Sequence, residues 1–500
     1  MTYKIGFAGT DGRTLLGALV VSTAKSEKQT QDFEGTVIRG TPAMLPFAEK
    51  MGWPVKFIPT ANNSVESYAS TIIEALKTGQ IDCVIPMPED LFYNGLVNKV
   101  TDAGLGNKIA GLTKRSSFLE GDKIACKRTC RSYDIPTADE WLVADARFPN
   151  EVMEKCWYLI GKHGGAVLKY PYSAGGKGSR IISNPWEIDE VYNKLLKDYG
   201  ENYEAILGKI SPWPLLIESK MSDVEISLVV LVDNNGHFQV LPTSMDYPER
   251  YAGTASISNP ITGGMGSISP HPMESRELIE LAKETVVRPL IKAMKKLDIL
   301  RPCILYPGCM VSFGSNKIDG FLRPTRIRVC EINIRPPEPE FQPVARRVRN
   351  LGTLIKAMFY GNLDEVIPEI RTEQISMNIA LVTGPGGLDG QKGYPWSYTK
   401  GERMEIDYGY FEKQGIQIIP SNMNYVKGIF ESDGSRVAFL NANATIKNSV
   451  PETAERLRTK LLSAFDGGKI RVMPRENPSG NRLDLRRDIG WHFSAIKNLR

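Results

Sequence analysis

The strongest chemical signal in the sequence is the segment 329–335, which reads Val-Cys-Glu-Ile-Asn-Ile-Arg. Alternate side chains of a β-strand share a face, so we expect Glu331, Asn333 and Arg335 to point the same way at intervals of about 7 Å. A carboxylate beside an amide carbonyl offers oxygen ligands suited to Mg²⁺, and a guanidinium can bind a phosphate or a carboxylate. The solvated face of an antiparallel strand would show the same pattern. The acidic stretch Glu338-Pro339-Glu340 immediately downstream favours a site.

A glycine-rich loop between two predicted strands is the second candidate. The sequence predicts strands at 166–170 and 179–183, and the loop 171–178 between them contains Gly175, Gly176, Lys177 and Gly178. A Walker A loop leads from a strand into a helix, so this loop is not one. Glycines let the backbone approach an anion and a lysine neutralises it, which suits a flap that closes over the phosphates of a nucleotide. An exposed hairpin tip explains the same residues when the loop is considered alone.

Two further carboxylates, Glu218 and Glu225, lie seven residues apart. Glu218 ends an apolar run and Glu225 precedes another, so the spacing predicts a hairpin turn between two strands. A carboxylate held there could accept hydrogen bonds from the hydroxyls of a ribose. A single glutamate on a hairpin is usually solvated, so this interpretation depends on the companion motifs.

The first hundred residues alternate between strand and helix patterns. Apolar runs predict strands at 4–9, 55–59 and 82–87, and helical periodicity predicts helices at 14–24 and 65–78. Such alternation indicates a parallel, doubly wound sheet whose ligand lies beyond the carboxyl ends of its strands. At the first strand-to-helix turn, Gly12 and Arg13 could bind a phosphate through free backbone N–H groups and the helix dipole. A tight turn alone explains these residues equally well.

The chain of 500 residues is long enough for several domains. We expect an N-terminal domain at 1–111, a middle domain rich in glycine loops and strands at 112–365, and a C-terminal domain at 366–500. The last contains predicted strands at 376–382 and 436–442 and a predicted helix near 453–465. These strand and helix patterns indicate an α/β fold class, α+β in part. No internal repeat or low-complexity linker separates the blocks, so we expect them to pack as one unit.

The composition excludes several classes of protein. With 42% hydrophobic and 24% charged residues the chain is neither disordered nor collagen-like, and no 18-residue apolar run predicts a membrane span. A net charge of +5 is too small to indicate a nucleic-acid partner. The start of the chain resembles a buried strand and not a signal peptide, so a cytoplasmic location is expected. Seven scattered cysteines predict free thiols, with Cys126 and Cys130 in the core, and four separated histidines disfavour a zinc site.

The co-linear order of these motifs resembles that of the ATP-grasp ligases, and specifically of the phosphoribosylamine–glycine ligase (glycinamide ribonucleotide synthetase) family. The resemblance runs through nearly the whole chain. The segments that carry it are 117–123 with 125–128 and 134–138, Lys169 with 174–178, Glu218 and Glu225 with Ser227, 262–270, 331–335 with 339–342, 393–401 and 487–490.

The resemblance implies a fold and a set of site residues. The fold would be an N-terminal doubly wound domain, an ATP-grasp core with a small lid subdomain at about 131–222, and a mixed α/β C-terminal domain. The residues that would bind ATP are Lys123, Lys169, Gly175, Gly176, Gly178, Glu218 and Glu225. Glu331 and Asn333 would bind Mg²⁺ or Mn²⁺, and Arg335, Lys177 and Glu338 would act in catalysis. The substrates would contact Gly12, Arg13, Asp246, Gly264, Met265 and Gly266.

The implied reaction joins glycine to 5-phosphoribosylamine in purine biosynthesis. ATP would phosphorylate the glycine carboxylate, and the amine would then displace phosphate from the glycyl phosphate, giving glycinamide ribonucleotide, ADP and phosphate. This route needs no covalent enzyme nucleophile, and the sequence contains no Ser-His-Asp or Cys-His arrangement. The expected partners are small-molecule substrates, without nucleic acid or membrane, and the enzyme would be a monomer or a homodimer.

The sequence departs from the family pattern where the family handles glycine and the aminosugar phosphate. Thr14-Leu15 replaces Glu-His, the segment 246–250 has lost a lysine, the stretch up to Gly263 is longer, and Pro336-Pro337-Glu338 replaces Phe-Gly-Asp. One alternative is therefore a paralogous ATP-grasp ligase with another amino acid or amine. A second is a nucleotide-binding sensor or scaffold without catalysis. Retention of the lysines and of the Glu331–Asn333 pair argues against the second alternative.

Overall fold

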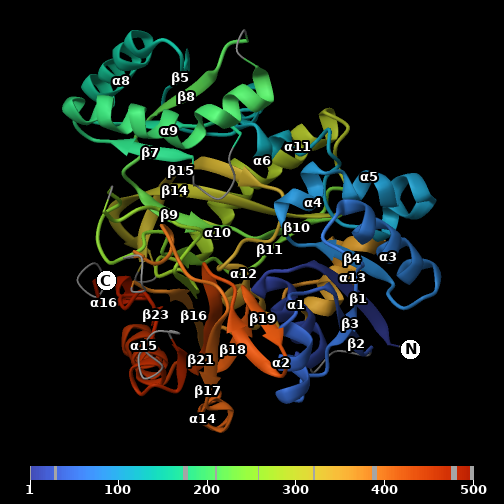
Figure 1. Ribbon diagram of the computed structural model, residues 1–500. Helices are drawn as coiled ribbons and strands as arrows, with labels where there is room; N and C mark the ends of the chain where they lie inside the picture. The colour runs from blue at the N-terminus through green and yellow to red at the C-terminus, as the bar shows by residue number, and fades with distance from the viewer. Residues whose placement is uncertain are drawn as a thin grey trace.

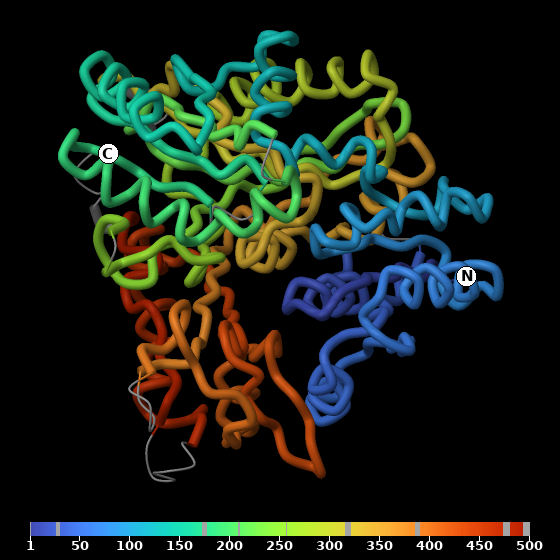
Figure 2. The backbone as a smooth tube through the Cα atoms, turned by 45° about the horizontal axis from the view of Figure 1, so that its top comes forward, coloured from blue at the N-terminus to red at the C-terminus, as the bar shows by residue number. Residues whose placement is uncertain are grey.

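The computed structural model describes residues 2–26, 31–172, 178–208, 211–256, 258–318, 321–385, 391–473 and 481–495. In Figure 1 a small sheet with two long helices lies at the top, a long central hairpin lies below it, the N-terminal sheet lies to the right and the C-terminal strands lie at the bottom. The turned view in Figure 2 shows the same arrangement. Within the described part of the chain, no helix combines the length and apolar character that a bilayer crossing requires.

The N-terminal sheet is parallel throughout, as the sequence predicts. Its strand order is β3 (Lys56–Ile58), β2 (Phe33–Arg39), β1 (Tyr3–Gly9) and β4 (Cys83–Pro86). The predicted helices are α1 (Gly12–Thr23) and α3 (Val65–Lys77), which begin after the side-chain caps Asp11 and Ser64. The strand β2 was not predicted. Helix α1 is apolar nearly all round because α12 (Phe341–Arg346) and α13 (Leu351–Tyr360) pack against it as well as the sheet.

The central sheet is built around a long antiparallel hairpin, β14 (Cys303–Ile318) and β15 (Phe321–Asn333). Its strand order is β11 (Phe238–Val240), β10 (Val230–Val232), β14 and β15, and β9 (Val224–Ser227) also pairs with β14. Helices α7 (Lys123–Ser132) and α10 (Arg276–Ala282) contact β15, and α11 (Arg288–Lys296) follows α10. Buried aliphatic side chains of these elements form one continuous core with the α3 side of the N-terminal sheet.

A small four-stranded sheet with its own core lies within the range predicted for the lid. Its order is β5 (Trp141–Asp145), β8 (Pro214–Ser219), β6 (Ala166–Lys169) and β7 (Ser179–Ile182), and α8 (Pro149–His163) and α9 (Ile188–Leu207) pack against it. The predicted strand–loop–strand arrangement around 171–178 is confirmed by the β6–β7 pairing. The hairpin predicted between Glu218 and Glu225 is wrong, because β8 belongs to this sheet and β9 to the central one.

The C-terminal block shares a sheet with the middle of the chain. Its order is β12 (Met245–Asp246), β13 (Gly266–Ser269), β16 (Gln374–Thr383), β21 (Arg436–Thr445) and β18 (Gln417–Pro420). A second sheet contains β19 (Met423–Val426), β20 (Ile429–Ser432), β17 (Glu402–Ile406) and β22 (Ile470–Met473), and α15 (Val450–Asp466) packs against β16 and β21. The shared sheet brings the substrate-side segment around Asp246 next to the C-terminal strands.

The remaining α-helices and strands are short. They are α2 (Met44–Lys50), α4 (Glu89–Tyr93), α5 (Leu96–Val100), α6 (Phe118–Gly121), α14 (Tyr408–Gln414), α16 (His492–Ala495) and β23 (Leu483–Asp484). All seven cysteines are unpaired, and Cys126 and Cys130 are buried, as predicted.

Candidate active site

One cavity, of about 220 Å³, gathers many of the predicted site residues between the small sheet, the central sheet and the shared C-terminal sheet. They reach it from β6, β8, β9, β12, β15 and the segment after β15. The predicted residues that line it are Lys169, Glu218, Glu225, Asp246, Glu331, Arg335 and Glu338. The neighbouring lining residues Tyr306 and Glu340 were not predicted as site residues.

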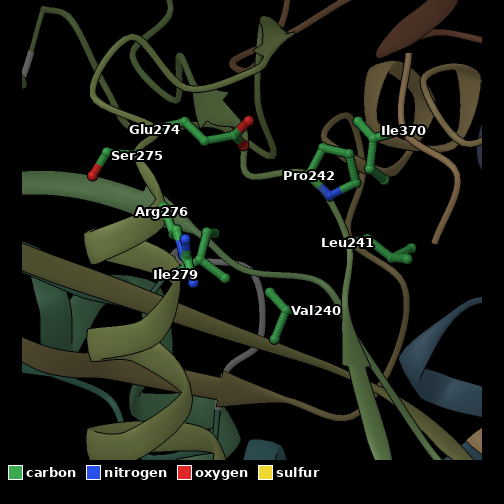
Figure 3. Close-up of a pocket in the computed structure, with 8 residues that line it drawn as sticks. All are labelled: Val240, Leu241, Pro242, Glu274, Ser275, Arg276, Ile279 and Ile370. Carbon is green, nitrogen blue, oxygen red and sulfur yellow. The ribbon is translucent and has the colours of Figure 1, made fainter. Parts of the chain in front are cut away.

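A larger cavity of about 350 Å³ lies beside α10 and lacks this chemistry (Figure 3). Its acid, Glu274, is already satisfied, because one oxygen accepts from the backbone N–H and the hydroxyl of Thr243 at 2.7 and 2.6 Å. The rest of its lining is largely apolar, with Arg276 as its basic residue. The cavity beside α10 therefore does not rival the one that gathers the predicted site residues.

Glu331 and Asn333 lie together, as strand alternation predicts. The Asn333 amide donates to Glu331 Oε1 at 3.1 Å and to the backbone carbonyl of Tyr306 at 3.3 Å, and Lys123 Nζ lies 3.9 Å from Glu331 Oε2. Asn333 is 2% exposed, which excludes the solvated-face interpretation. Burial alone would raise the pKa of Glu331, but Lys123 and the Asn333 hydrogen bond bring it below its usual value. Glu331 is therefore an anion at neutral pH.

This pair fits a magnesium ion that is shared with a nucleotide. Among the described residues, no group of three or more His, Cys, Asp or Glu side chains is arranged to hold a metal. Mg²⁺ usually takes one or two protein oxygens and completes its shell with phosphates and water. The Glu331 carboxylate and the Asn333 amide oxygen, once the amide is turned, would supply those two.

Glu218 is buried between two lysines. Lys127 and Lys169 place their Nζ atoms 2.8 and 2.5 Å from its two oxygens, and Lys127 also donates to the carbonyl of Val329 at 3.1 Å. Burial would raise the pKa of Glu218, but the two ammonium groups lower it to about 2. In this arrangement Glu218 holds the lysines, and its predicted contact with the nucleotide stays a prediction.

Sequence reasoning missed Lys127, although a signal was present. It lies one turn after Lys123 on α7, so a helix that presents Lys123 inward presents Lys127 on the same face. Both side chains are buried. Lys127 and Lys169 together form a doubly positive site that a phosphate could occupy.

Arg335 is held by two carboxylates that the sequence did not reveal. Its Nε lies 2.9 Å from Glu89 Oε2 and 3.1 Å from Glu120 Oε1, and the other Glu120 oxygen accepts from the backbone N–H of Ile334 at 3.0 Å. Burial would lower the pKa of Arg335, but these carboxylates raise it above the usual value. The guanidinium therefore stays charged where it lines the cavity.

The structure describes only part of the predicted flap. Gly175, Gly176 and Lys177 lie outside the described residues. Gly178 follows them, and its carbonyl accepts from the backbone N–H of Tyr170 at 2.9 Å, at the base of the β6–β7 hairpin. The roles predicted for this loop stay predictions.

The turn before α1 already contains carboxylates. Asp11 Oδ1 caps the N–H of Thr14, Glu338 Oε2 accepts from the N–H of Arg13 at 3.3 Å, and Arg13 Nε donates to Asp11 Oδ2 at 2.8 Å. The Arg13 guanidinium also donates to the carbonyl of Pro336. A phosphate at Gly12 and Arg13 would have to displace these groups, so its binding there stays a prediction.

The other predicted substrate residues divide into two groups. Asp246 lines the cavity, and a Cβ on Gly264 would lie 2.9 Å from Asp246 Oδ1 and 2.3 Å from Pro339, so the close approach requires glycine there. Met265 is fully buried in a hydrophobic core, and a Cβ on Gly266 would lie 2.6 Å from the carbonyl of Asn378. These two positions serve packing in the structure.

Comparison with known sequences gives a consistent family. Residues 121–341 match the family model of the phosphoribosylglycinamide synthetase ATP-grasp (A) domain. The chain is 27% identical over 369 residues to phosphoribosylamine–glycine ligase of Rhodopirellula baltica, which covers 73% of this chain and 77% of the relative. The corresponding ligase of Caldanaerobacter subterraneus subsp. tengcongensis is 27% identical over 379 residues, 75% of this chain and 79% of the relative.

Solved structures share the fold. Phosphoribosylamine–glycine ligase of Thermotoga maritima superposes with a TM-score of 0.67 at 21% identity, over 97% of this chain and all (100%) of that one. The biotin carboxylase domain of Hydrogenobacter thermophilus 2-oxoglutarate carboxylase, solved with MgADP, ADP and bicarbonate, gives a TM-score of 0.59 at 16% identity, over 92% and 89%. The predicted ATP-grasp fold class is confirmed.

Proposed function

We propose that this chain, which belongs to the phosphoribosylglycinamide synthetase family of ATP-grasp ligases, joins glycine to 5-phosphoribosylamine with ATP. The observation that carries the proposal is the meeting of Lys169, Glu331 and Arg335 in one cavity, with Lys127 and Asn333 bonded to its lining. The products are glycinamide ribonucleotide, ADP and phosphate, and the pathway is purine biosynthesis. A cytoplasmic location and a monomer or homodimer are part of the same proposal.

The lysine end of the cavity binds the phosphates of ATP. Lys127 and Lys169 already share an anionic partner in Glu218, and a phosphate oxygen can take its place between them. Glu331 and Asn333 would hold Mg²⁺, which spreads the negative charge of the phosphates when it is bound. Burial, followed by repulsion from Glu331, raises the pKa of Glu225 to about 7, and its carboxyl group can bond the ribose hydroxyls.

The chemistry needs positioning and charge more than a nucleophile. The glycine carboxylate attacks the terminal phosphoryl group of ATP, forming glycyl phosphate and releasing ADP. The amine then attacks the acyl carbon, the C–N bond forms and phosphate leaves. Arg335 lies where it can bind the donor carboxylate or the phosphoryl group during its transfer. The loop with Lys177 would close over the site and exclude water.

One observation favours a second candidate, a ligase with another amine acceptor. Glu338 and Asp11 occupy the N-terminus of α1, where the acceptor phosphate was expected, and burial followed by repulsion from Asp11 raises the pKa of Glu338 to about 7. A carboxyl group in that place disfavours a phosphate and would suit an acceptor without one.

The test is ADP release measured across a panel of amino acids and amines. The proposed function expects ADP and a ligated product only when glycine and phosphoribosylamine are both present. ADP with another pair would support the second candidate. No ADP with any pair would support a nucleotide-binding protein without catalysis and would refute both.

A further inference from the structure

The second sheet of the C-terminal block contains a gap where two neighbouring strands stop pairing. β17 and β20 are joined by antiparallel pairs, the last of which is Arg403 with Glu431. The same register would next pair residues 404–406 with residues 428–430, but among the described residues no such pair forms. Both strands continue there, since the first segment still pairs with β22 and most of the second with β19. The two strands therefore diverge at this point.

A cavity of about 640 Å³ lies in the gap. The residues of the missing pairs all line it, namely Met404, Glu405, Ile406, Gly428, Ile429 and Phe430. A Cβ built on Gly428 would meet no atom within 4 Å, so the space beside this hairpin turn is open. The volume lies within the range of about 300–1,000 Å³ that is typical of ligand pockets. The gap is therefore large enough to hold a short segment of chain.

Helix α2 of the N-terminal block supports both strands where they diverge. The ring of Phe47 on α2 packs against Phe430 of β20 and against Tyr408 just after β17, with ring centroids 5.6 and 5.7 Å apart. Phe47 is fully buried, and α2 lies beside these strands (Figure 1). Glu49 and Lys50 of the same helix line the cavity. The gap is thus part of the packing between the two blocks.

Each of the two strands directs main-chain groups into the gap. In an antiparallel pair, alternate residues bond the neighbouring strand, and the residues between them direct their N–H and C=O groups to the other side. At least one residue of 404–406 must therefore direct both groups away from β22, and either Ile429 or Phe430 must direct them away from β19. No strand of the described ranges pairs with them there. Unpaired main-chain groups of this kind are a template for an added strand.

The rim of the gap carries exposed apolar side chains. Tyr425, Val426 and Ile429 on the β19–β20 hairpin and Leu45 on α2 are between 38% and 43% exposed. The charged lining residues balance, since they are two acids and two bases: Glu49, Lys50, Arg403 and Glu405. Apolar side chains around unpaired backbone, without net charge, suit a peptide and disfavour a phosphate or a nucleic acid.

We propose that an extended segment of a partner protein binds in this gap and adds a β-strand against β17 or β20. Main-chain hydrogen bonds to the unpaired groups would supply affinity, and alternate side chains of the segment would pack on the apolar rim. The matching segment alternates apolar with polar residues and has little net charge. Because strands bound the gap on two sides and α2 lines it on a third, a single strand fits it better than the sheet edge of a second copy does.

The experiment uses the full-length protein, with a phage library of random linear peptides as the probe. Selected peptides are tested against Ile429→Asp, which places a charge on the rim, and against Ile367→Asp, at an exposed isoleucine that does not line the cavity, as the matched control. Thermal unfolding checks both variants. Dissociation constants are measured with and without saturating MgATP.

The selected peptides should bind the wild type and the Ile367 variant equally and the Ile429 variant about tenfold more weakly, because a charge is costly among apolar groups. Versions of each peptide with a single backbone N-methyl group should show an alternating pattern. Methylation at every second position should weaken binding by about tenfold through loss of a main-chain hydrogen bond, and the positions between should tolerate it. This pattern distinguishes an added strand from binding by side chains alone and does not depend on the folding of a variant.

Several results would overturn the proposal. They are a selection that yields no peptide, an absent N-methyl pattern, and unchanged binding to the Ile429 variant. Displacement of the peptides by MgATP would place them in the active-site cavity instead. Self-association of the wild type that Ile429→Asp abolishes would assign the gap to a second copy of this chain. None of these measurements depends on ligase activity, so this inference and the proposed function succeed or fail separately.

Discussion

Where β8 meets α7, the Glu218 carboxylate lies 2.8 and 2.5 Å from Lys127 and Lys169, so both lysines have an anionic partner there. Where β12 meets the segment after β15, Asp246 and Glu340 each have a buried oxygen that accepts no hydrogen bond from the described residues. These three acids line one cavity, but only Glu218 has a lysine paired with each of its two oxygens. A protein anion occupies the place proposed for a phosphate, whereas no donor among the described residues reaches Asp246 Oδ1 or Glu340 Oε2. The difference indicates that the end of the cavity at Glu218 is stable without a ligand, because its charges are paired within the protein. The end at Asp246 and Glu340 carries a cost of burial that a ligand would relieve.

Replacing Glu218 with glutamine should have the largest effect, a loss of stability around the two lysines. Two buried lysines would lose their anionic partner, and removing one member of a buried ion pair typically costs about 3–5 kcal/mol. Chemical denaturation of the ligand-free protein should show this loss, and MgATP should stabilise the variant more than the wild type because phosphate replaces the missing anion.

The matched control is Glu140→Gln, at the residue just before β5 of the same small sheet. Glu140 also contacts two bases, Lys162 and His163 at 2.8 and 3.0 Å, but it is more exposed, so its loss should matter little. Equal stabilisation of the wild type and the Glu218 variant by MgATP would show that Glu218 does not compete with phosphate for the lysines.

Replacing Glu331 with glutamine tests the two proposed Mg²⁺ ligands, Glu331 and Asn333. The variant keeps the shape and loses the charge that would bind Mg²⁺, and loss of one well-placed electrostatic contact typically lowers turnover by roughly a hundredfold. ADP release at saturating substrates measures the effect, and raising Mg²⁺ should restore part of the rate. Wild-type turnover in this variant would contradict the assignment.

The sequence predicted the regular parts of this site because local rules govern them. Glu331 and Asn333 share a face since the β14–β15 pairing is regular from Glu331 to Asn333, beyond the irregularity at Cys330, so a period of two was enough there. The β6–β7 hairpin and the parallel N-terminal sheet followed in the same way from alternating patterns.

The rest of the site depends on contacts that no local pattern records. Arg335 meets Glu120 across 215 residues, and Lys127 on α7 meets Glu218 on β8. The hairpin predicted between Glu218 and Glu225 failed because seven residues suffice equally for a turn and for a crossing between sheets. Glu340 was noticed only as part of a motif, since a missing hydrogen bond is a property of the folded chain.

Replacing Lys127 with glutamine tests whether this lysine binds the phosphates of ATP. Glu218 would keep Lys169 as its partner, so the fold should survive, but one cation for the phosphates would be lost. The Michaelis constant for ATP should rise about tenfold, within the range of one charged hydrogen bond. Arg128→Gln, at the exposed neighbour on α7, is the control and should leave it unchanged. An unaltered constant in the Lys127 variant would limit the phosphate site to Lys123 and Lys169.

The smallest expected effect is a pH dependence that arises from the acidic side of the cavity. Burial, followed by repulsion from Asp11, raises the pKa of Glu338 to about 7, above the value of an unfolded glutamate. The stability from its neutral form is thus complete below the unfolded pKa and is lost as pH rises through about 7. The ligand-free protein should lose about 1 kcal/mol between about pH 6 and pH 8 through this group. In thermal unfolding, Glu338→Gln should remove this part of the slope and leave the part that comes from Glu225, whose pKa burial also raises to about 7. A smaller slope in the variant would show that the buried charge of Glu338 lowers stability at neutral pH. An unchanged slope of stability against pH would show that other groups titrate.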